Sequence, residues 1–424
     1  MTGVRHIDRI TGPLDAAVTL PGSKSITNRA LVCAALATGT STLVDALDAD
    51  DTRAMMSSFK VLGVAVERRD SIMSIVGCGG RFSAGKVTVD ARMSGTTSRF
   101  LLPLAALGTG PITVDGGLQL RARPMGDGVT ALASLGVTVE SNAGALPIRV
   151  QPLPAMSSRP SIAVSGAVSS QFLSGLLMLG PVLPHGLEVR VTGELRSRPY
   201  VDMTIAVMRR FGARVGEAVE GTFDVEATGY VATDMTIEPD ASAASYFVGA
   251  AAVVGGRVRI NLRRHSVQGD LRFADVVEFM GANVTWSDDE VEIEHDLSTP
   301  LRGVDVDMAD ISDTAQTLAV IAPFADSPTT ITGIGFIRRK ETDRIVATVA
   351  ELRRCGVEAD ELPDGIRIHP GTPRPAQIRT YDDHRMAMSF ALIGLRTGMD
   401  ILDPDCVSKT FPGFWDTLDS LRQG

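Results

Sequence analysis

The sequence predicts an α/β protein built from six similar units in tandem, and three observations lead to this fold class. The first is a recurring segment in which a short β-branched strand precedes a tight polar turn and an apolar helix rich in Ala and Leu. The second is a glycine after an amphipathic helix in five of the units, and the third is an alternating stretch after each such glycine. Each unit is therefore expected to run β-α-β-α-β-β.

The recurring segments are spaced almost evenly along the chain. They begin at Val18, Val87, Ile162, Thr236, Val304 and Ile378, and are therefore 68 to 75 residues apart. So steady a period is typical of an internally repeated architecture. We expect the residue named in each case to start the first strand of a repeat.

Five glycines mark the end of the second helix in a repeat. They are Gly63, Gly136, Gly212, Gly281 and Gly356. Because glycine adopts positive φ without a steric penalty, it is the usual residue just past a helix C-terminus. We expect left-handed backbone at all five positions and a β-hairpin after each, such as residues 64–77.

The sixth repeat stops before its last two strands. Residues 1–20 contain the stretch RHIDRI and no helix of their own, so they can supply the missing strands. We therefore expect one domain of three repeats at residues 21–238 and a second domain at residues 1–20 and 239–424. Six independent units in a solenoid would leave the N-terminal strands unexplained.

Composition excludes several classes of protein. The 424 residues include 41 basic and 50 acidic side chains, and the net charge of −9 argues against binding nucleic acid through bulk charge. The four cysteines lie far apart, which argues against a disulfide framework or a structural zinc site. No apolar stretch approaches the roughly 18 residues of a membrane span. We expect a cytoplasmic protein without a membrane or nucleic-acid partner.

The turn PGSKSITNR at residues 21–29 joins a predicted strand to a predicted helix. Backbone N–H groups at a helix N-terminus favour anions, and Lys24 and Arg29 add positive charge. The GxxxxGK[ST] spacing of a nucleotide P-loop is missing. On this segment alone, a phosphate site and a Ser-capped helix with two solvated cations both remain open.

Equivalent turns in the next two repeats are also polar. Gly95 in ARMSGTTSR allows a ligand to approach the backbone closely, and Arg123 lies in a loop that opens a helix. Ser169-Ser170-Gln171 offers hydroxyls and an amide at a helix start, although Ser is a routine N-cap. The stretch Ser197-Arg198-Pro199-Tyr200 opens the following helix.

The last repeats add charged residues. We predict a helix that begins with KETDR, which places Lys340 and Arg344 on one face, four residues apart. Two cations in a first helical turn oppose the helix dipole, so a bound anion would compensate, but an ordinary salt-bridge ladder is the alternative. Asp313 and the run Asp383-His384-Arg385 complete the set. Together the polar turns indicate a ligand that carries phosphate and carboxylate groups, bound in a cleft between the domains.

Several of these segments resemble one known family. The segments PGSKSITNRALVCAALA, SGAVSSQFLSGLLM, RSRPYVDMT, EPDASAASYFVGAAA, RRKETDRIVATVAELRRCG and YDDHRMAMSFALIGL are similar to 5-enolpyruvylshikimate-3-phosphate (EPSP) synthases, in order, from about residue 10 to residue 422. The resemblance implies two inside-out α/β domains, each of three β-α-β-α-β-β repeats, with the active site in the interdomain cleft.

The resemblance also implies the reaction, in which the enolpyruvyl group of phosphoenolpyruvate moves to the 5-hydroxyl of shikimate 3-phosphate and phosphate is released. This step belongs to the shikimate pathway to chorismate and the aromatic amino acids. We expect no cofactor and no metal, small-molecule substrates as the partners, and a monomer.

The resemblance assigns residues by motif position. Shikimate 3-phosphate would contact Lys24, Ser25, Arg29, Ser169, Ser170, Gln171, Ser197, Tyr200, Asp313 and Lys340. Phosphoenolpyruvate would contact Lys24, Gly95, Arg123, Gln171, Arg344, Arg385 and Lys409. The catalytic residues would be Lys24, Asp313, Glu341 and His384, with Asp313 at the attacking hydroxyl and Lys24 and Glu341 as the two candidates for proton transfer to the enolpyruvyl group.

Two other functions are alternatives for this sequence. The first is the sibling enolpyruvyl transferase that acts on UDP-N-acetylglucosamine, which typically carries a cysteine in the loop that corresponds to residues 117–123, where this chain has none. The second is a noncatalytic repeat scaffold. Four residues depart from the family pattern, namely Met93, Phe100, Phe336 and Arg198, and the last of these keeps the positive charge of the usual Lys. Gly95 is retained, so the resemblance implies inhibition by glyphosate.

Overall fold

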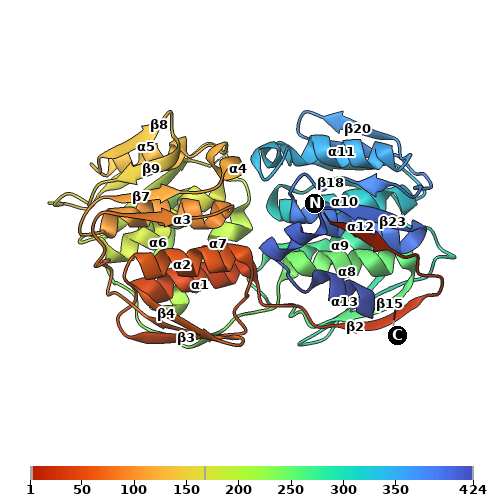
Figure 1. The fold of residues 1–424 in the computed structure, drawn as a ribbon, viewed down its shortest axis with the longest axis horizontal. Helices are drawn as coiled ribbons and strands as arrows, with labels where there is room; N and C mark the ends of the chain where they lie inside the picture. The colour runs from red at the N-terminus through yellow and green to blue at the C-terminus, as the bar shows by residue number, and fades with distance from the viewer. Residues whose placement is uncertain (1–2, 167–168, 423–424) are drawn as a thin grey trace. The chain divides into compact units, whose positions relative to one another are not determined.

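The computed structural model describes residues 3–166 and 169–422, and the chain divides into two compact units (Figure 1). One unit spans residues 22–238, and the other combines residues 1–21 with residues 239–424. Within the described residues, each unit contains three small mixed sheets with helices between them. This arrangement confirms the predicted α/β class and its repeated units.

The second repeat shows the plan of one unit. Its first two strands pair in parallel, the second strand pairs antiparallel with the fourth, and the third strand lies at the edge of the sheet. The elements are β6 (Val87–Asp90), α3 (Gly95–Leu104), β7 (Ile112–Asp115), the short α4 (Leu118–Arg121), α5 (Gly126–Ser134), β8 (Val139–Asn142) and β9 (Ala145–Val150).

The other repeats of the 22–238 unit follow this plan. The first contains α1 (Lys24–Leu36), β3 (Thr40–Val44), α2 (Asp50–Val61), β4 (Ala65–Arg69) and β5 (Ile72–Val76). The third contains β10 (Ser161–Ser165), α6 (Ser170–Leu179), β11 (Leu187–Thr192), α7 (Arg198–Arg210), β12 (Val215–Val219) and β13 (Thr222–Val225), and β14 (Met235–Thr236) follows it.

The second unit repeats the same order of elements after the N-terminal strands β1 (Val4–Ile7) and β2 (Leu14–Val18). The fourth repeat contains α8 (Ala241–Val254), β15 (Gly256–Ile260), α9 (Arg272–Met280), β16 (Asn283–Trp286) and β17 (Val291–His295). The fifth contains β18 (Asp305–Asp307), α10 (Ala315–Ile321), β19 (Thr329–Thr332), α11 (Arg344–Arg354), β20 (Ala359–Leu362) and β21 (Gly365–Ile368). The sixth contains β22 (Gln377–Ile378), α12 (His384–Thr397), β23 (Met399–Leu402) and α13 (Phe414–Ser420).

Two first strands belong to different sheets from those expected. We predicted that the strand around Val18 opens the first repeat and that the strand at Thr236 opens the fourth. Instead, β2 pairs in parallel with β15 of the fourth repeat, and β14 pairs in parallel with β3 of the first. The chain passes between units only after each of these strands, at residues 21–22 and 238–239, so each strand stays in the sheet of the unit that the chain is leaving.

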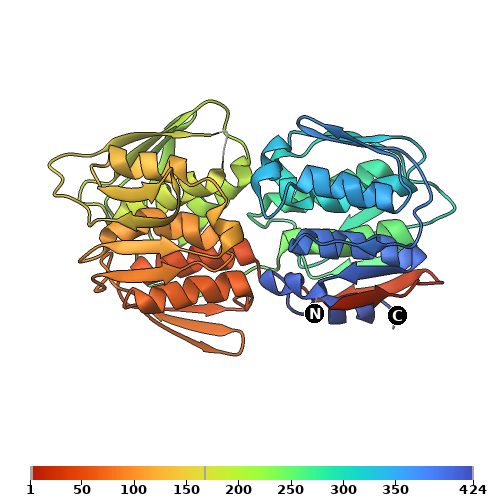
Figure 2. The ribbon, with the colours of Figure 1, turned by 45° about the horizontal axis from the view of Figure 1, so that its top comes forward.

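The N-terminal strands complete two sheets rather than one. Strand β1 pairs antiparallel with β23 and gives the sixth repeat a three-stranded sheet, as Figure 2 shows beside the C-terminal strand. Strand β2 is used in the fourth repeat. The expectation that residues 1–20 supply both missing strands of the sixth repeat is therefore correct for β1 and wrong for β2.

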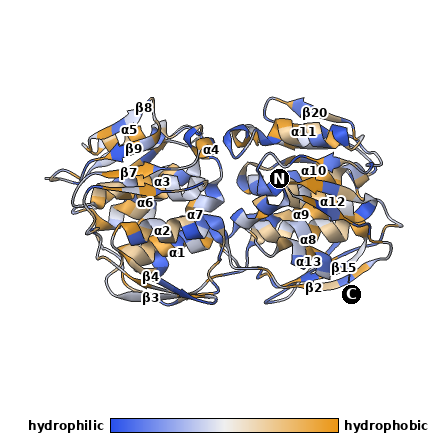
Figure 3. Cartoon of the chain, viewed as in Figure 1, coloured by the Kyte–Doolittle hydropathy of each residue, from blue (hydrophilic) through white to orange (hydrophobic). Residues whose placement is uncertain are grey.

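The first helix of each repeat lies inside its unit. In α1 every residue from Ile26 to Leu36 is buried, and in α12 every residue from His384 to Leu395 is buried. Figure 3 shows hydrophobic colour on helices such as α8 and α12. Burial on all sides explains why these helices are rich in Ala, Gly and Leu, since small residues let helices approach closely.

All five predicted left-handed glycines are confirmed. Gly63, Gly136, Gly212, Gly281 and Gly356 have φ between 77° and 116°. Each follows the second helix of its repeat, and an antiparallel hairpin follows each glycine, from β4–β5 to β20–β21.

Across the described helices, none combines the length and the apolar character that a bilayer crossing requires.

A substitution at Gly249 in α8 tests the close packing of the interior helices. A Cβ at this position would lie 2.7 Å from Leu392 Cδ1, 3.2 Å from Thr317 Cγ2 and 3.3 Å from Ile321 Cδ1. We predict that Gly249→Val destabilises the protein by about 1–3 kcal/mol, the usual cost of overpacking a core. Both tryptophans, Trp286 and Trp415, lie in the same unit, so their fluorescence during urea unfolding measures the change.

The matched control is Gly371→Val, because a Cβ at Gly371 meets nothing within 4 Å. We expect its unfolding midpoint to equal that of the parent chain. Equal midpoints for the two variants would contradict the packing argument.

Candidate functional site

A buried cluster of carboxylates and cations, which we call the Arg344 cluster, lies in the unit of residues 1–21 and 239–424. It joins the starts of helices α11 and α12 to the segment before α10 and to the 3-10 helix Pro404–Lys409. Its members are Asp313, Glu341, Arg344, Asp383, Arg385 and Lys409. The cluster contains three acidic and three basic side chains, so its formal charges balance.

Arg344 is the centre of this cluster. Its guanidinium donates to Asp383 from Nε at 2.7 Å and from Nη2 at 3.2 Å, and Nη2 also donates to Glu341 Oε2 at 2.8 Å. A third carboxylate, Asp313, accepts from Nη1 at 3.3 Å. The side chain is only 2% exposed. Burial acts to lower the pKa of Arg344, but Asp383 and Glu341 together raise it above its ordinary range.

Arg385 holds Asp313 from the other side. Its Nη2 donates to Asp313 Oδ2 at 2.6 Å, and its Nη1 donates to the Asp313 carbonyl at 2.7 Å and to the Tyr246 hydroxyl at 3.3 Å. Burial raises the pKa of Tyr246 to about 12. The two arginines fix both oxygens of the Asp313 carboxylate, since one binds Oδ1 and the other binds Oδ2.

Lys409 extends the cluster through Glu341. Its Nζ lies 2.6 Å from Glu341 Oε1, while Arg344 binds Oε2 of the same carboxylate. Both side chains are largely buried. Glu341 therefore bridges two of the cations that the sequence assigns to phosphoenolpyruvate.

The Asp383 carboxylate makes a second contact, with the backbone of Arg385. The Asp383 carboxylate caps helix α12 by accepting from the Arg385 backbone N–H at 2.9 Å, and it is fully buried. His384, the first residue of this helix, is 2% exposed, and its Nδ1 lies 3.7 Å from Asp383 Oδ1. One carboxylate thus joins the start of α12 to Arg344.

Lys340 does not lie in the predicted helix. Helix α11 begins at Arg344, and Asp343 caps it by accepting from the N–H groups of Ile345 and Val346 at 3.1 and 3.0 Å. Lys340 ends the preceding 3-10 helix (Gly335–Arg339), so the expected i,i+4 face with Arg344 is wrong. The physical reason is that the Asp343 carboxylate can cap a helix N-terminus, so the helix begins after Asp343 and not at Lys340.

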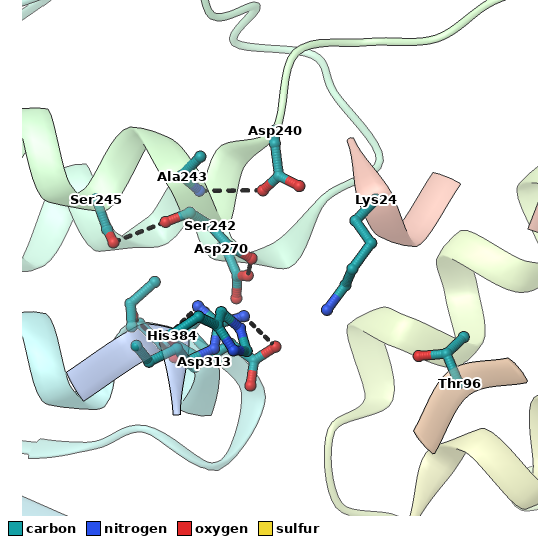
Figure 4. Close-up of polar contacts among 12 residues, drawn as sticks. Lys24, Thr96, Asp240, Ser242, Ala243, Ser245, Asp270, Asp313 and His384 are labelled. Atoms are coloured by element: carbon teal, nitrogen blue, oxygen red, sulfur yellow. Dashed lines mark hydrogen bonds and ion pairs between the residues drawn. The ribbon is translucent and has the colours of Figure 1, made fainter. Parts of the chain in front are cut away.

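A further buried carboxylate beside the cluster, Asp270, was not predicted from the sequence. Ser242 in the first turn of α8 donates to Asp270, and Figure 4 shows this pair beside Asp313 and His384. Burial, followed by the charge of Asp313, raises the pKa of Asp270 to about 6. Asp270 lies outside the repeated turns on which the sequence predictions rested, so the repeat pattern carried no signal for it.

In the 22–238 unit, Lys24 is the first residue of α1. Ser23 caps this helix by accepting from Ile26 N–H at 3.4 Å, and Lys24 Nζ lies 3.7 Å from Asp51 Oδ2. The Lys24 side chain is 14% exposed. A helix start with a neutral cap and a cation keeps the character of an anion-binding turn.

Arg29 is buried between helices α1 and α7. It donates to Thr204 Oγ1 at 2.7 Å and to the carbonyls of Ser25 and Tyr200 at 3.0 and 3.1 Å. Burial lowers its pKa to about 10. Arg29 therefore joins two residues that the sequence assigns to shikimate 3-phosphate.

A second group in this unit surrounds Gly95 at the start of α3. A Cβ at Gly95 would lie 2.9 Å from Arg123 Nη1 and 3.1 Å from Arg99 Nη1. Arg99 donates to Gln171 Oε1 at 2.8 Å, and Gln171 donates to Thr96 at 3.1 Å. Arg99 was not among the predicted site residues, although it ends the ARMSGTTSR turn that was singled out.

The predicted serines have different backbone roles. Ser169 caps α6 by accepting from Gln171 N–H at 3.3 Å, and Ser170 begins that helix. Ser197 precedes α7 with φ of 57°, a left-handed conformation that is uncommon for a residue other than glycine. Such a conformation at a proposed contact is typical of functional sites.

Two of the family departures lie against predicted substrate contacts. The ring of Phe100 lies 5.2 Å from the guanidinium carbon of Arg29, and the ring of Phe336 lies 5.9 Å from Lys340 Nζ. Both are cation–π distances. Each aromatic ring therefore interacts with its cation through a cation–π contact and not through a hydrogen bond. Met93 lies close to Gly117 in the loop before α4.

The predicted residues are thus found in two sets, one in each unit. The 22–238 unit contains Lys24, Ser25, Arg29, Gly95, Arg123, Ser169, Ser170, Gln171, Ser197 and Tyr200. The other unit contains Asp313, Lys340, Glu341, Arg344, His384, Arg385 and Lys409, and all of these except Lys340 and His384 belong to the Arg344 cluster.

Comparisons with known proteins identify the family of the chain. The family model described as EPSP synthase (3-phosphoshikimate 1-carboxyvinyltransferase) matches residues 9–418. The chain is 44% identical to the 3-phosphoshikimate 1-carboxyvinyltransferase of Nostoc punctiforme over 417 residues, which covers 97% of each chain. It is 41% identical to the protein of the same name from Serratia proteamaculans over 420 residues, again with 97% of each covered.

Solved structures share the fold. An EPSP synthase from Acinetobacter baumannii matches with a TM-score of 0.81 at 24% identity, covering 99% of this chain and 98% of that one. The enolpyruvyl transferase NikO from Streptomyces tendae matches with a TM-score of 0.77 at 18% identity, covering 99% and 97%. From the family match over nearly the whole chain and the full-length relatives above 40% identity, the chain belongs to the EPSP synthase (3-phosphoshikimate 1-carboxyvinyltransferase) family.

Proposed function

We propose that the two sets of residues bind shikimate 3-phosphate and phosphoenolpyruvate for the EPSP synthase reaction. The observation that carries this proposal is the grip of Arg344 and Arg385 on Asp313. A carboxylate held by two buried arginines places a proton acceptor next to groups that bind carboxylate and phosphate in bidentate geometry. Few structural roles require so many buried charges in one place.

Phosphoenolpyruvate is assigned to cations from both sets. In the Arg344 cluster these are Arg344, Arg385 and Lys409, which are held by Asp383, Asp313 and Glu341. In the 22–238 unit the assignment includes Lys24, Gly95, Arg123 and Gln171. The close approach of Arg123 and Arg99 to Gly95 supports an anion site there, because two guanidinium groups lie against the N-terminus of helix α3.

Shikimate 3-phosphate is assigned to hydroxyl-bearing turns. Its phosphate and hydroxyls would contact Lys24, Ser25, Arg29, Ser169, Ser170, Gln171, Ser197, Tyr200, Asp313 and Lys340. Arg29 also donates to the carbonyls of Ser25 and Tyr200, so it would help to position these two neighbours as well as contact the substrate.

The proton transfers follow from the same geometry. Asp313 would accept the proton of the 5-hydroxyl as its oxygen attacks the enolpyruvyl carbon. Glu341 and Lys24 are the candidates for supplying a proton to the methylene carbon, and His384 lies beside Asp383 at the start of α12. The C–O bond to phosphate then breaks, and the methyl carbon formed in the addition returns one proton to a base, so that the enol ether forms. The expected compartment, the cytoplasm, and the expected monomeric state rest on the sequence alone.

Release of phosphate from phosphoenolpyruvate, measured with two acceptors, tests the assignment. We expect release with shikimate 3-phosphate and none with UDP-N-acetylglucosamine. Release only with the sugar nucleotide would overturn the acceptor assignment while preserving the chemistry. A folded protein that is silent with both acceptors would instead support a noncatalytic scaffold.

Asp313→Asn tests the proposed base. The substitution keeps the size of the side chain but removes its capacity to accept a proton, so we predict a fall in kcat of about 10²- to 10⁴-fold. Steady-state kinetics measure this effect, and tryptophan fluorescence checks that the variant is folded. The control is Asp305→Asn, an exposed carboxylate in the same unit, for which we expect parental kinetics. An active Asp313→Asn enzyme would exclude Asp313 as the base.

Gly95→Ala tests the backbone site at α3. The added Cβ would crowd Arg123 Nη1 at 2.9 Å and Arg99 Nη1 at 3.1 Å, so both guanidinium groups must shift. We predict a KM for phosphoenolpyruvate raised by roughly tenfold or more, since about 1.4 kcal/mol of lost binding has that effect. The KM for shikimate 3-phosphate should change little.

Gly126→Ala in the same unit is the control, because its Cβ would meet nothing within 4 Å. We expect both KM values to stay at the parental level in that variant. If Gly95→Ala also leaves the KM for phosphoenolpyruvate unchanged, Gly95 does not contribute to that site.

A further inference from the structure

Glu351 in α11 is a buried carboxylate that the proposed chemistry does not use. Its side chain has no exposed surface, and it accepts three different donors. The Tyr381 hydroxyl donates to Oε1 at 2.7 Å, the Arg379 backbone N–H donates to Oε2 at 3.1 Å, and Arg354 Nε donates to Oε2 at 2.9 Å. Two of the three donors come from one loop, residues 379–382, immediately before α12.

This loop is strained at the point where it turns into the helix. Tyr381 and Asp382 are consecutive residues with φ of 56° and 54°, in the left-handed region that residues other than glycine avoid. Backbone in such a conformation persists only when neighbouring contacts hold it. The next residues along the chain are Asp383, which caps α12, and His384 and Arg385, which begin it.

One face of α11 contacts residues 381–386 at three successive positions. Arg344 binds the Asp383 carboxylate, Thr348 Oγ1 lies 3.6 Å from Met386 Sδ, and Glu351 binds the loop. These residues are at positions i, i+4 and i+7, which share one face of a helix. Arg344 lies at the N-terminal end of this face of α11, and Glu351 lies at its C-terminal end.

We propose that Glu351 and Tyr381 form a latch that positions Arg385 relative to Arg344 for binding phosphoenolpyruvate. The latch fixes the strained loop on α11, and the loop leads directly to Asp383, whose carboxylate orients Arg344 and caps the start of α12. Both latch residues act on the cluster through the loop and Asp383, so both are positioning residues. The inference rests on the proposed assignment of Arg344 and Arg385 to phosphoenolpyruvate.

The Tyr381 hydroxyl stays protonated at neutral pH. Burial and then the Glu351 carboxylate raise the pKa of Tyr381 above its ordinary value, so the hydroxyl stays a donor. A hydrogen bond to a buried charged acceptor is stronger than one between neutral groups. Loss of the hydroxyl should therefore loosen the loop while leaving the hydrophobic core intact.

Tyr381→Phe is the direct test, with kinetics measured on the full chain. We expect the KM for phosphoenolpyruvate to rise about three- to tenfold, with the KM for shikimate 3-phosphate within twofold of the parent, since the loss of one charged hydrogen bond has at most an effect of this order. Glu351→Gln, which removes the charge that holds both donors, should shift the same constant at least as far. The urea midpoint followed by tryptophan fluorescence checks that both variants are folded.

Arg354→Gln is the matched control. Arg354 binds the same Glu351 carboxylate but is not part of the loop, so we expect its KM for phosphoenolpyruvate to stay within twofold of the parent. A rise equal to that of Tyr381→Phe would show that any loss at Glu351 has this effect, and the latch would be rejected.

Arg385→Lys separates the two proposals. If this variant raises the KM for phosphoenolpyruvate and Tyr381→Phe does not, the latch is wrong and the assigned anion site stands. If neither variant changes that constant, Arg385 does not bind phosphoenolpyruvate, and the latch falls with the assignment. Equal rises in both substrate constants for Tyr381→Phe would indicate general loosening and would also overturn the latch.

Discussion

Burial of Arg344 is the constraint on which the C-terminal part of the candidate site depends. A guanidinium that is 2% exposed is costly to remove from water unless carboxylates surround it, and here three of them do. Asp383 is the most consequential of the three, because it pairs with Arg344 and also caps α12. The start of one helix is therefore tied to the start of the next. Loss of Asp383 would leave both a buried cation and a helix end without this partner.

A side chain caps the first helix in five of the six repeats, but the two units use different residue types for the cap. In the 22–238 unit the interior helices α1, α3 and α6 are capped by Ser23, Ser94 and Ser169. In the other unit α8 and α12 are capped by Asp240 and Asp383. A neutral cap leaves the positive end of the helix dipole available to an anion, whereas an acidic cap already neutralises it. The Ser-capped turns therefore suit direct contact with a phosphate, and the Asp-capped turns suit the holding of arginines.

Local patterns in the sequence were enough to predict the repeat, the left-handed glycines and the hairpins, because each depends on residues close together in the chain. Strand pairing was harder to predict. The strands that end at Val18 and Thr236 fit either sheet by composition, and only the position of the crossings decided their partners. The helix start at Lys340 was misplaced because charge spacing was weighed above the cap at Asp343. Asp270 and Glu351 were missed because a lone carboxylate in a sequence gives no indication of burial.

Under the proposed assignment of phosphoenolpyruvate to the Arg344 cluster, the charge balance of the cluster would link binding to proton transfer. Arg344 and Lys409 are already paired with Glu341, at 2.8 and 2.6 Å, so an anionic substrate must compete with that carboxylate for both cations. A nearby cation favours the ionised form of a carboxylate, and a nearby anion disfavours it. As phosphoenolpyruvate takes over these cations, Glu341 would lose its partners and gain an anionic neighbour, and both changes favour protonation. The same exchange that binds the substrate would thus prepare Glu341 to carry a proton, which is the property that an acid at the methylene carbon requires.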